Sequence, residues 1–423
     1  MIERASFDSH PDLYYAVCDI SCLPPARLSL DRGCHMSEMT SKERVRTTFA
    51  HREPDRVPIF EIYIAERPLA ALLGQPPADG ATRLRTDCER IRAGDRDGVV
   101  RDHIRDVLAA HRLLGFDLID VHPTYGAEPL LPEEIAPNTW RYDDPAGFWS
   151  VVHWDEGPDV FFSVDSSISR EGLAGFKRYV EYLESLPADP DLRMFDPLVY
   201  VLENAPDLFI LGDADVTCPT LAPWVTVYLE ALIEAPELVE RYMDVTMERE
   251  LKGLRYQLEL GVDGVIGRND WYGKNGPFMS PRHFRRFIMP YLKMIVDECH
   301  RHGVPFIEHL DGNTMPTADE LWVELGIDGY HAIEPTAGMD IGLLKRRYGR
   351  HLTLLGNIDC GQTLTFGTEE EIRGEVRRIL REAAPGGGFV FASSNSLHGR
   401  VPLENIWAMV RAVREYGAYP IGV

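Results

Sequence analysis

Eight short apolar runs are spread along this chain, and nearly every one of them ends in Asp, Glu, His or Asn. The runs are VPIFEIY (57–63), LGFDLIDVHP (114–123), DLFILGDAD (207–215), VDGVIGRND (262–270), VPFIEHLDG (304–312), DGYHAIEP (328–335), LTLLGNID (352–359) and GFVFASSN (388–395). Most are followed by a stretch with helical spacing, and this alternation is typical of an α/β protein of the (β/α)8 TIM barrel type. Active sites in that fold lie at the carboxyl ends of the strands. The sequence therefore predicts where a site lies before it indicates a reaction.

The predicted barrel follows an N-terminal segment of different character. Residues 1–38 contain three of the seven cysteines, the pair Pro24-Pro25 and no sustained periodicity, so we expect a loosely ordered extension. Thr40 and Glu43 have capping-box spacing and predict a helix start, so one barrel domain is predicted over residues 39–423. Further helix starts are predicted at Thr317-x-x-Glu320, at Thr368-x-x-Glu371 and at Ser280-Pro281, the last for a helix that runs to His302.

The regular alternation is interrupted between the second and third predicted strands. The stretches TWRYDDPAGFWSVVHWDEG (139–157) and DVFFSVDSS (159–167) alternate aromatic or β-branched residues with polar ones and are divided by Pro and Gly. This pattern is typical of antiparallel hairpins. We predict an antiparallel insertion over about residues 123–205 that covers the barrel mouth as a lid or substrate wall.

The composition excludes several classes of partner. With 44 Lys and Arg against 67 Asp and Glu, the formal charge is −23, which opposes binding to nucleic acids and to anionic membrane surfaces. No apolar run approaches the roughly 18 residues that span a bilayer. The first residues, MIERASFDSHPDLYYAV, lack the apolar core of a secretory signal. A sparse, odd set of seven cysteines favours reduced thiols, so we expect a cytoplasmic protein.

The end of the fifth predicted strand carries the strongest candidate pair, His309 and Asp311. Residues two apart on a strand share a face, so both side chains are predicted to point into the barrel mouth. The pair has the chemistry of two metal ligands, of a general acid and base, or of a histidine held in one tautomer by a carboxylate. A purely structural hydrogen-bonded pair that caps the strand is the alternative.

Polar residues at the other strand ends are predicted to form a ring with this pair. The fourth strand ends in Asn269 and Asp270, and Trp271 and Tyr272 follow as an aromatic wall. The remaining candidates are Glu61, Asp120, His122, Asp213, Glu334, Asn357, Asp359, Asn395 and His398. Cys360 is either a metal-binding thiolate or an ordinary buried thiol. Histidines 103, 111, 300 and 302 fall on predicted helices and are expected to be solvated.

Several segments resemble the uroporphyrinogen decarboxylase superfamily, which also includes corrinoid-linked methyltransferases. They are SKERVRTTFAHREPDRVPIFE, NDWYGKNGPFMSPRHFRRFIMPYLKMIVDECHRHGVPFIEHLDGN, GMDIGLLKRRYG, LLGNIDCGQTLTFGTEEEI and SSNSLHGRVPLENIWAMVRAVREYG. The resemblance covers about residues 40–420 and implies a single (β/α)8 barrel, in agreement with the number of apolar runs.

The chain departs from the decarboxylase members of this family. Those enzymes carry an arginine-rich segment after the first strand that grips substrate carboxylates, whereas EIYIAERPLAALLG contains only Arg67. Their histidine at the eighth strand falls at Asn395. A porphyrinogen with many carboxylates would meet a mouth rich in acids, so we do not expect porphyrinogen decarboxylation.

The methyltransferase members bind zinc through a His-x-Cys pair at the fifth strand and a Cys at the eighth. These positions are His309, Asp311 and Asn395 here, so the resemblance implies a zinc site with harder ligands, formed by His309 and Asp311 with Glu334, Cys360 or His398. It also implies a corrinoid presented by a partner protein, and a homodimer is a further expectation.

Three functions stay open at this point. The first is a corrinoid-linked methyltransferase or demethylase that acts on a small methylated compound. The second is a decarboxylase of a small carboxylated substrate, with Asp270 or Asp311 as the acid and His309 as the proton carrier. The third is a binding protein without catalysis. The predicted catalytic residues are His309, Asp311, Asp270 and Asn395. The predicted substrate-binding residues are Glu61, His122, Asn269, Trp271, Tyr272, Glu334, Asn357 and His398.

Overall fold

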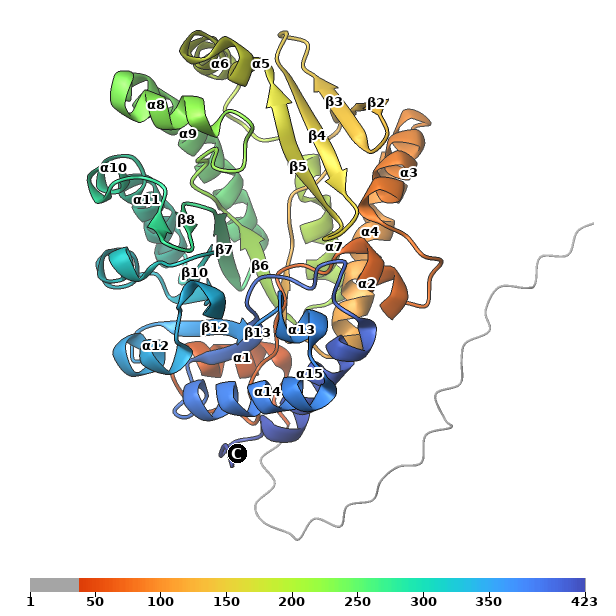
Figure 1. Ribbon diagram of the computed structural model, residues 1–423, viewed down its shortest axis with the longest axis vertical. Helices are drawn as coiled ribbons and strands as arrows, with labels where there is room; N and C mark the ends of the chain where they lie inside the picture. Colours follow the sequence, from red (N-terminus) through yellow and green to blue (C-terminus); the bar gives the residue numbers. More distant parts are fainter. Residues whose placement is uncertain (1–37, 423) are drawn as a thin grey trace, which may run out of the picture. The chain divides into compact units, whose positions relative to one another are not determined.

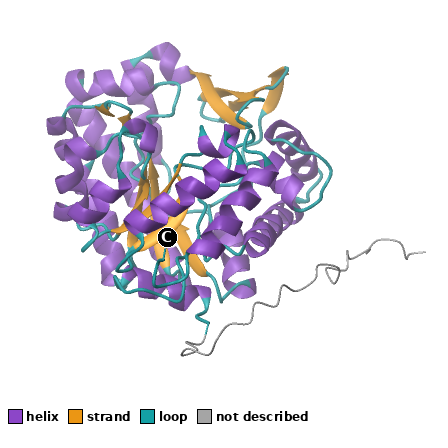
Figure 2. Cartoon of the chain, turned by 60° about the horizontal axis from the view of Figure 1, so that its bottom comes forward, coloured by secondary structure: helices purple, strands orange, loops and turns teal. Residues whose placement is uncertain are grey.

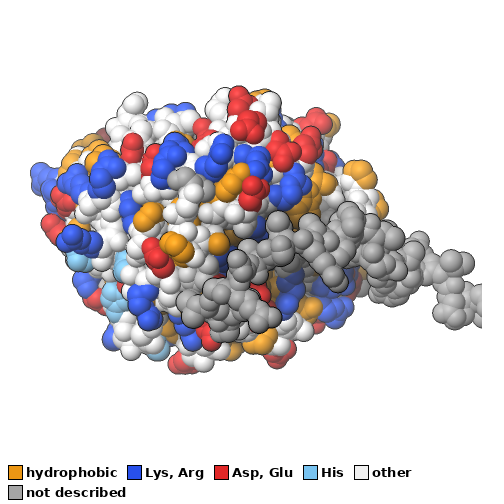
Figure 3. Space-filling model, turned by 90° about the horizontal axis from the view of Figure 1, so that it is seen from below, with side chains coloured by type: hydrophobic (Ala, Val, Ile, Leu, Met, Phe, Trp, Pro, Cys, Tyr) orange, Lys and Arg blue, Asp and Glu red, His pale blue; other side chains and the backbone are white. Residues whose placement is uncertain are grey.

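The computed structural model describes residues 38–422 (Figure 1). The prediction of a loosely ordered extension falls on residues 1–37, which lie outside the described residues. Within residues 38–422, none of the helices combines the length and the apolar character that crossing a bilayer requires. The charged side chains of both signs are interspersed on the face seen in Figure 3.

The centre of the described domain is a parallel sheet of seven strands in the order β1-β6-β7-β10-β11-β12-β13. The strands are β1 (Leu118–Asp120), β6 (Phe209–Asp213), β7 (Gly264–Asn269), β10 (Phe306–Leu310), β11 (Gly329–Ala332), β12 (Thr353–Ile358) and β13 (Phe389–Ser393). All seven coincide with predicted strands, and the pairing follows the chain order throughout. The prediction of a TIM-barrel-like α/β fold is confirmed.

The first predicted strand, residues 57–63, does not form a regular strand. Pro58 has no backbone N–H, which limits the ladder that this segment can form. The segment nevertheless hydrogen-bonds toward both edges of the sheet. The backbone N of Phe391 in β13 donates to the Pro58 carbonyl oxygen at 2.9 Å, and the backbone N of Asp117, next to β1, donates to the Ile59 carbonyl oxygen at 2.8 Å. This segment therefore joins β13 to β1.

Helices cover the outer face of the sheet (Figure 2). The helices of this layer are α2 (Glu66–Leu72), α4 (Arg96–Leu114), α8 (Val225–Glu234), α9 (Pro236–Leu260), α10 (Pro281–Phe287), α11 (Met289–Arg301), α12 (Ile341–Tyr348), α14 (Glu369–Ala383) and α15 (Leu403–Tyr416). Three further helices lie elsewhere: α1 (Ser41–Phe49) packs against the inward-facing strand residues, α3 (Gly80–Arg92) packs against Trp140 and Trp154, and α13 (Thr363–Phe366) follows the carboxyl end of β12. Strand residues alternate between the outer layer and an inner apolar cluster. Phe209, Ile266, Ile307 and Val390 belong to the inner cluster. Because the period is two, His309 and Asp311 continue the inward face that begins at Ile307.

The helix starts agree with the sequence in part. The capping boxes of Thr40 with Glu43 and of Thr368 with Glu371 are both present, so those predictions are confirmed. The prediction at Thr317 is wrong, because Met315–Thr317 forms a 3-10 turn, Asp319–Glu324 forms a π-helix, and neither has a side-chain cap. The helix predicted from Pro281 to His302 is divided at Ile288, where Pro290 removes a backbone donor.

An antiparallel sheet of four strands lies between β1 and β6 in the chain. Its strands are β2 (Glu133–Ala136), β3 (Thr139–Asp143), β4 (Trp149–Asp155) and β5 (Val160–Ser166), paired in that order. The residues that follow are helical instead of extended: α5 (Ser167–Glu171), α6 (Leu173–Ser185) and α7 (Asp196–Asn204). A two-stranded ribbon, β8 (Tyr272–Gly273) with β9 (Gly276–Pro277), follows β7. The turn between β4 and β5 is the part of the sheet that contributes to the site described below.

Candidate functional site

An inner polar layer lies above the inner apolar cluster, at the carboxyl ends of β1, β6 and β7. Its centre is Arg268, whose guanidinium donates to Asp120 at 2.5 Å and also to Asp213. Its backbone N–H donates to Asp215. Although burial opposes ionisation, Arg268 and His122 hold the pKa of Asp120 well below its usual range. Asp120 is therefore a carboxylate, and the layer is held together by buried ion pairs.

Two stacked imidazoles extend this layer toward β11. His309 and His331 are cross-strand neighbours, with Nδ1 atoms 2.7 Å apart and ring centroids 4.9 Å apart. Burial and the Arg268 guanidinium lower the pKa of His309 to about 3, and burial and His309 hold the pKa of His331 well below its ordinary value. Both rings are thus neutral, and one proton lies between the two Nδ1 atoms. Each neutral ring can donate a hydrogen bond from one nitrogen and accept one at the other.

Asp311 lies next to this pair at the end of β10. Its Oδ2 accepts from Asn395 Nδ2 at 2.6 Å, and its buried Oδ1 has no hydrogen-bond partner among the described residues. His309 Nε2 lies 3.8 Å from Oδ1. Burial and the neighbouring Glu334 raise the pKa of Asp311 to about 7. A carboxyl group with such a pKa is suited to general acid–base work near neutral pH.

The loop after Asp311 requires a glycine. Gly312 has a φ of 78°, and a Cβ at this position would lie 2.5 Å from the Gly273 carbonyl oxygen. The Gly312 N–H donates to Glu334 Oε2 at 3.1 Å, which holds this second carboxylate beside Asp311. Asp270 is the third acid of the group, because burial and Asp311 raise its pKa to about 6.

A cavity of about 740 Å³, here called the mouth cavity, lies over the ends of β10 to β13. Six predicted residues line it: Asp311, Glu334, Asp359, Cys360, Asn395 and His398. The turn between β4 and β5 contributes Asp155, Pro158 and Val160 to the wall. Four carboxylates of the lining, Asp155, Asp311, Glu334 and Asp359, face two cations, Lys274 and Arg400. The cavity therefore has a surplus of acidic groups.

Five residues that were predicted to bind substrate are buried and do not line the mouth cavity, so their role in binding stays a prediction. Glu61 and Asn269 lie one position out of phase with the inward residues, so they face the helices. Glu61 accepts from the N–H and hydroxyl of Ser393, and burial raises its pKa to about 8, whereas Asn269 donates to Glu308 at 2.8 Å.

The other three of these residues, Trp271, Tyr272 and Asn357, are buried by packing. Trp271 is fully buried against Phe284, and Tyr272 is buried with its hydroxyl 2.5 Å from Thr317 Oγ1. They belong to the hydrophobic core and form no aromatic wall at the mouth. Asn357 is also buried and donates to the Ile333 carbonyl oxygen at 3.2 Å.

The described side chains do not fit the zinc site that the resemblance implies. Among residues 38–422, no group of three or more His, Cys, Asp or Glu side chains has an arrangement that could hold a metal ion. Nδ1 of His309 is engaged by His331, and Oδ2 of Asp311 is engaged by Asn395. Burial raises the pKa of Cys360, so this residue is a thiol. Zinc stays a prediction, and no chemical step is derived through it.

Two residues of the inner polar layer were missed in the sequence, Arg268 and His331. Each lies on the inward face of an apolar run, Arg268 two residues before Asp270 and His331 opposite His309. Counting back by two from the strand ends would have found Arg268, because alternation alone places it on the inward face.

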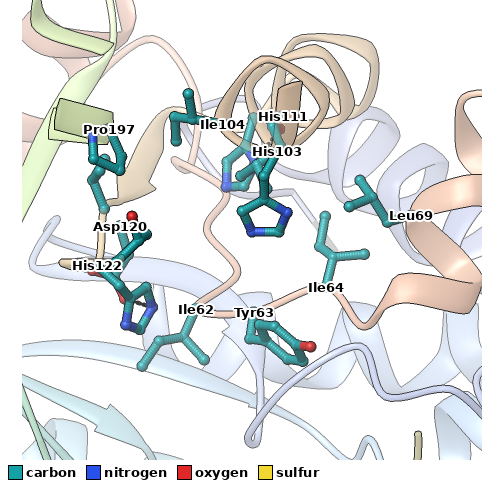
Figure 4. Close-up of a pocket in the computed structure, with 13 residues that line it drawn as sticks. Ile62, Tyr63, Ile64, Leu69, His103, Ile104, His111, Asp120, His122 and Pro197 are labelled. Atoms are coloured by element: carbon teal, nitrogen blue, oxygen red, sulfur yellow. Dashed lines mark hydrogen bonds and ion pairs between the residues drawn. The ribbon is translucent and has the colours of Figure 1, made fainter. Parts of the chain in front are cut away.

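A second cavity, of about 220 Å³, lies beside β1 and is here called the side cavity (Figure 4). The predicted residue His122 lines this cavity and not the mouth cavity; its Nε2 lies 3.2 Å from Asp120 Oδ2. His103 and His111 of α4 line it too. The expectation that these two histidines are solvated is wrong for His111, which is 3% exposed.

Comparison with known proteins agrees with the resemblance seen in the sequence. The family model described as uroporphyrinogen decarboxylase (URO-D) matches residues 224–416. The uroporphyrinogen decarboxylase of Pseudoalteromonas translucida is 25% identical over 265 residues, which cover 57% of this chain and 71% of that protein. The enzyme of Methylococcus capsulatus is 28% identical over 189 residues, which cover 44% of this chain and 51% of that protein.

Over residues 224–416 the chain is therefore similar to the uroporphyrinogen decarboxylase family. It spans about half the length of most of the curated relatives considered, as in the Methylococcus enzyme. A solved methyltransferase from Methanosarcina mazei superposes with a TM-score of 0.57 at 19% identity, over 90% of this chain and 99% of that one, which shows a shared fold. The superfamily is enzymatic, and proteins named as decarboxylases and as a methyltransferase both resemble this chain.

Proposed function

We propose that this protein is a methyltransferase or demethylase that removes a methyl group from a small methylated compound. The observation that carries the proposal is Asp311. This residue places a carboxyl group with a pKa of about 7 and a free Oδ1 at the wall of an open cavity, beside a pair of neutral imidazoles.

The charge of the mouth cavity supports methyl transfer over decarboxylation of a porphyrinogen. Four carboxylates against two cations disfavour a substrate with several carboxylates, which decarboxylation of a porphyrinogen would require. A neutral methoxylated compound meets no such repulsion.

The residues supply the proton that the reaction needs. When the bond between the methyl carbon and the ether oxygen breaks, the methyl group goes to the acceptor and the bonding electron pair stays on the oxygen. Asp311 Oδ1 donates a proton to that oxygen, which makes it a better leaving group. Asn395 holds the other carboxylate oxygen. After the transfer, Asp311 takes up a proton from solvent in the mouth cavity that it lines, which restores the acid.

A corrinoid on a partner protein would serve as the methyl acceptor. The mouth cavity has room for an acceptor that approaches from solvent, and Phe366 at its lining is 73% exposed, which suits contact with an apolar partner surface.

The test is the demethylation of 2-methoxyphenol by the full chain in the presence of cob(I)alamin, followed as catechol formation. Asp311→Asn should lower the rate about 100-fold or more, the usual contribution of a general acid, without lowering the melting temperature. Asp155→Asn, which alters a second acid of the same cavity, should leave the rate within about threefold of the original.

A folded Asp311→Asn variant with the original rate would refute the proposed role.

A second candidate function is that of a carboxy-lyase. Two raised carboxyl pKa values favour it, about 6 for Asp270 and about 7 for Asp311, because a protonated acid can donate a proton to a carbanion. Release of CO2 from a small carboxylate without corrinoid, together with no catechol, would favour that reaction. If neither catechol nor CO2 is formed, the hypothesis of a binding protein without catalysis remains.

A further inference from the structure

We propose that the side cavity binds a neutral aromatic ring that carries hydroxyl or methoxy groups. This assignment rests on the proposed function in that the ring would be the body of the methylated substrate; binding itself can be measured without turnover.

The size and the walls of the side cavity fit an aromatic ring. Its volume is about 220 Å³, and a cavity of about 150 Å³ lined by aliphatic side chains is known to bind benzene. Most of the lining is apolar and comes from the 62–64 segment, α2, α4 and β1: Ile62, Ile64, Leu69, Ile104, Val107 and Val121. Figure 4 shows Ile62, Ile64, Leu69 and Ile104 around the same space as the histidines. The remaining room is sufficient for one or two small substituents on the ring.

Polar atoms without partners are concentrated at this cavity. Among the described residues, twelve buried side-chain nitrogen or oxygen atoms have no hydrogen-bond partner, and four of them belong to residues that line the side cavity: His103, His111, Asp120 and Thr124. The nearest carboxylate to His103 Nδ1, that of Glu66, is 3.8 Å away, which is too far for a hydrogen bond. Buried polar atoms are normally satisfied, so a ligand with hydroxyl or ether oxygens would complete this site.

The charges at the cavity select a neutral ligand. Asp120 is ionised and its charge is matched by Arg268, so a carboxylate on the ligand would find no free cation there. Burial, Arg83 and His122 lower the pKa of His103 to about 4, so this imidazole is neutral as well. A neutral ring with hydrogen-bonding substituents is favoured over an anionic one.

The side cavity adjoins the same inner polar layer as the mouth cavity. Asp120 lines the side cavity and binds Arg268, Arg268 is the cross-strand neighbour of His309, and Asp311 follows His309 on the same inward face. Tyr63 and His122, which are 41% and 43% exposed, leave the side cavity open to solvent. A ring can therefore enter the side cavity and contact the inner polar layer at Asp120.

The test measures the binding of 2-methoxyphenol and of benzoate to the full chain by calorimetry, without corrinoid. Saturable binding of 2-methoxyphenol is expected, with benzoate at least tenfold weaker. Val107→Phe places a larger side chain from α4 in the cavity, so it should weaken the binding of 2-methoxyphenol at least tenfold. Leu113→Phe on the same helix, where Leu113 is 42% exposed and outside the lining, should leave binding unchanged.

Absence of saturable binding, binding unaffected by a folded Val107→Phe variant, or equal binding of benzoate would each overturn the proposal. If Val107→Phe does not fold, Ile104→Phe is measured in its place under the same criteria. Failure of the proposed function is distinguishable: binding that depends on Val107 without catechol formation would remove the reaction and keep the site. Catechol formation that is insensitive to Val107→Phe would keep the reaction and remove the site.

Discussion

The mouth cavity and the side cavity border one polar layer but differ in kind. The mouth cavity, about 740 Å³, is walled by carboxylates that follow the strand ends, whereas the side cavity, about 220 Å³, is walled mainly by aliphatic side chains from α4 and its surroundings. Asp311, a carboxyl group whose pKa is raised to about 7, lines the first, and unpartnered polar atoms of His103, His111, Asp120 and Thr124 belong to the lining of the second. The comparison suggests a division between chemistry at the strand ends and recognition by shape beside β1.

Arg268 is the centre of the inner polar layer, so its loss should have the largest effect. Arg268→Met leaves Asp120 and Asp213 without their cation in a buried setting, which should lower the free energy of unfolding by about 3–5 kcal/mol. Urea unfolding measures this cost. We also expect that both 2-methoxyphenol binding and demethylation fall in the surviving folded fraction.

The matched control is the double variant Arg268→Met with Asp120→Asn. Because it removes one of the stranded charges, it should recover part of the lost stability, and the two substitutions should be non-additive. An additive pair would show that Arg268 and Asp120 are not coupled, and the description of a shared layer would then fail.

The sequence predicted the parts of the fold and site that depend on local patterns. Seven of the eight apolar runs became strands, and period two placed His309 and Asp311 on one face. The same alternation places Glu61 and Asn269 on the outward face. They were predicted at the mouth only because they are polar residues near strand ends, and strand ends carry polar residues on both faces. Pro58 and Pro290 account for the irregular first strand and the divided helix.

The side cavity could not be predicted in this way. His103 lies on the helix α4, and its meeting with Asp120 of β1 and with Thr124 depends on how that helix packs on the sheet. No periodicity in the sequence encodes that contact. Likewise, the pairing of His309 with His331 depends on the register of β10 and β11.

The response to pH should separate the two cavities. Demethylation needs the protonated form of Asp311, so the rate should fall about tenfold per pH unit above a pKa of about 7. The groups proposed to contact 2-methoxyphenol, His103 with a pKa of about 4 and the ionised Asp120, do not titrate near pH 7, so its Kd should not follow the fall of the rate. Rates and calorimetric Kd values over one pH series measure both.

The same carboxyl group should affect stability with a defined sign. The pKa of Asp311 is raised in the folded state to about 7 from about 3.9 in the unfolded chain, so the folded protein binds the proton more tightly. Its contribution therefore favours folding at low pH and is lost as the pH rises from about 4 to about 7. Asp311→Asn should raise the melting temperature relative to the original protein above pH 7, roughly, and this difference should disappear near pH 4. A difference that grows toward low pH would contradict the raised pKa.

The smallest expected effect concerns His103, which lines the side cavity and takes no part in the proposed proton transfer. His103→Leu removes the unpartnered Nδ1 while keeping an apolar side chain of similar size. It should weaken the binding of 2-methoxyphenol by the free energy of one neutral hydrogen bond, about 0.5–1.5 kcal/mol. This corresponds to a Kd that is roughly two- to twelvefold higher. Benzene, which cannot form that bond, should bind the variant at least as well as the original protein, and calorimetry with both ligands measures the difference. If His103→Leu weakened the binding of benzene and of 2-methoxyphenol equally, His103 would shape the cavity without recognising an oxygen. The side cavity would then be a purely apolar site.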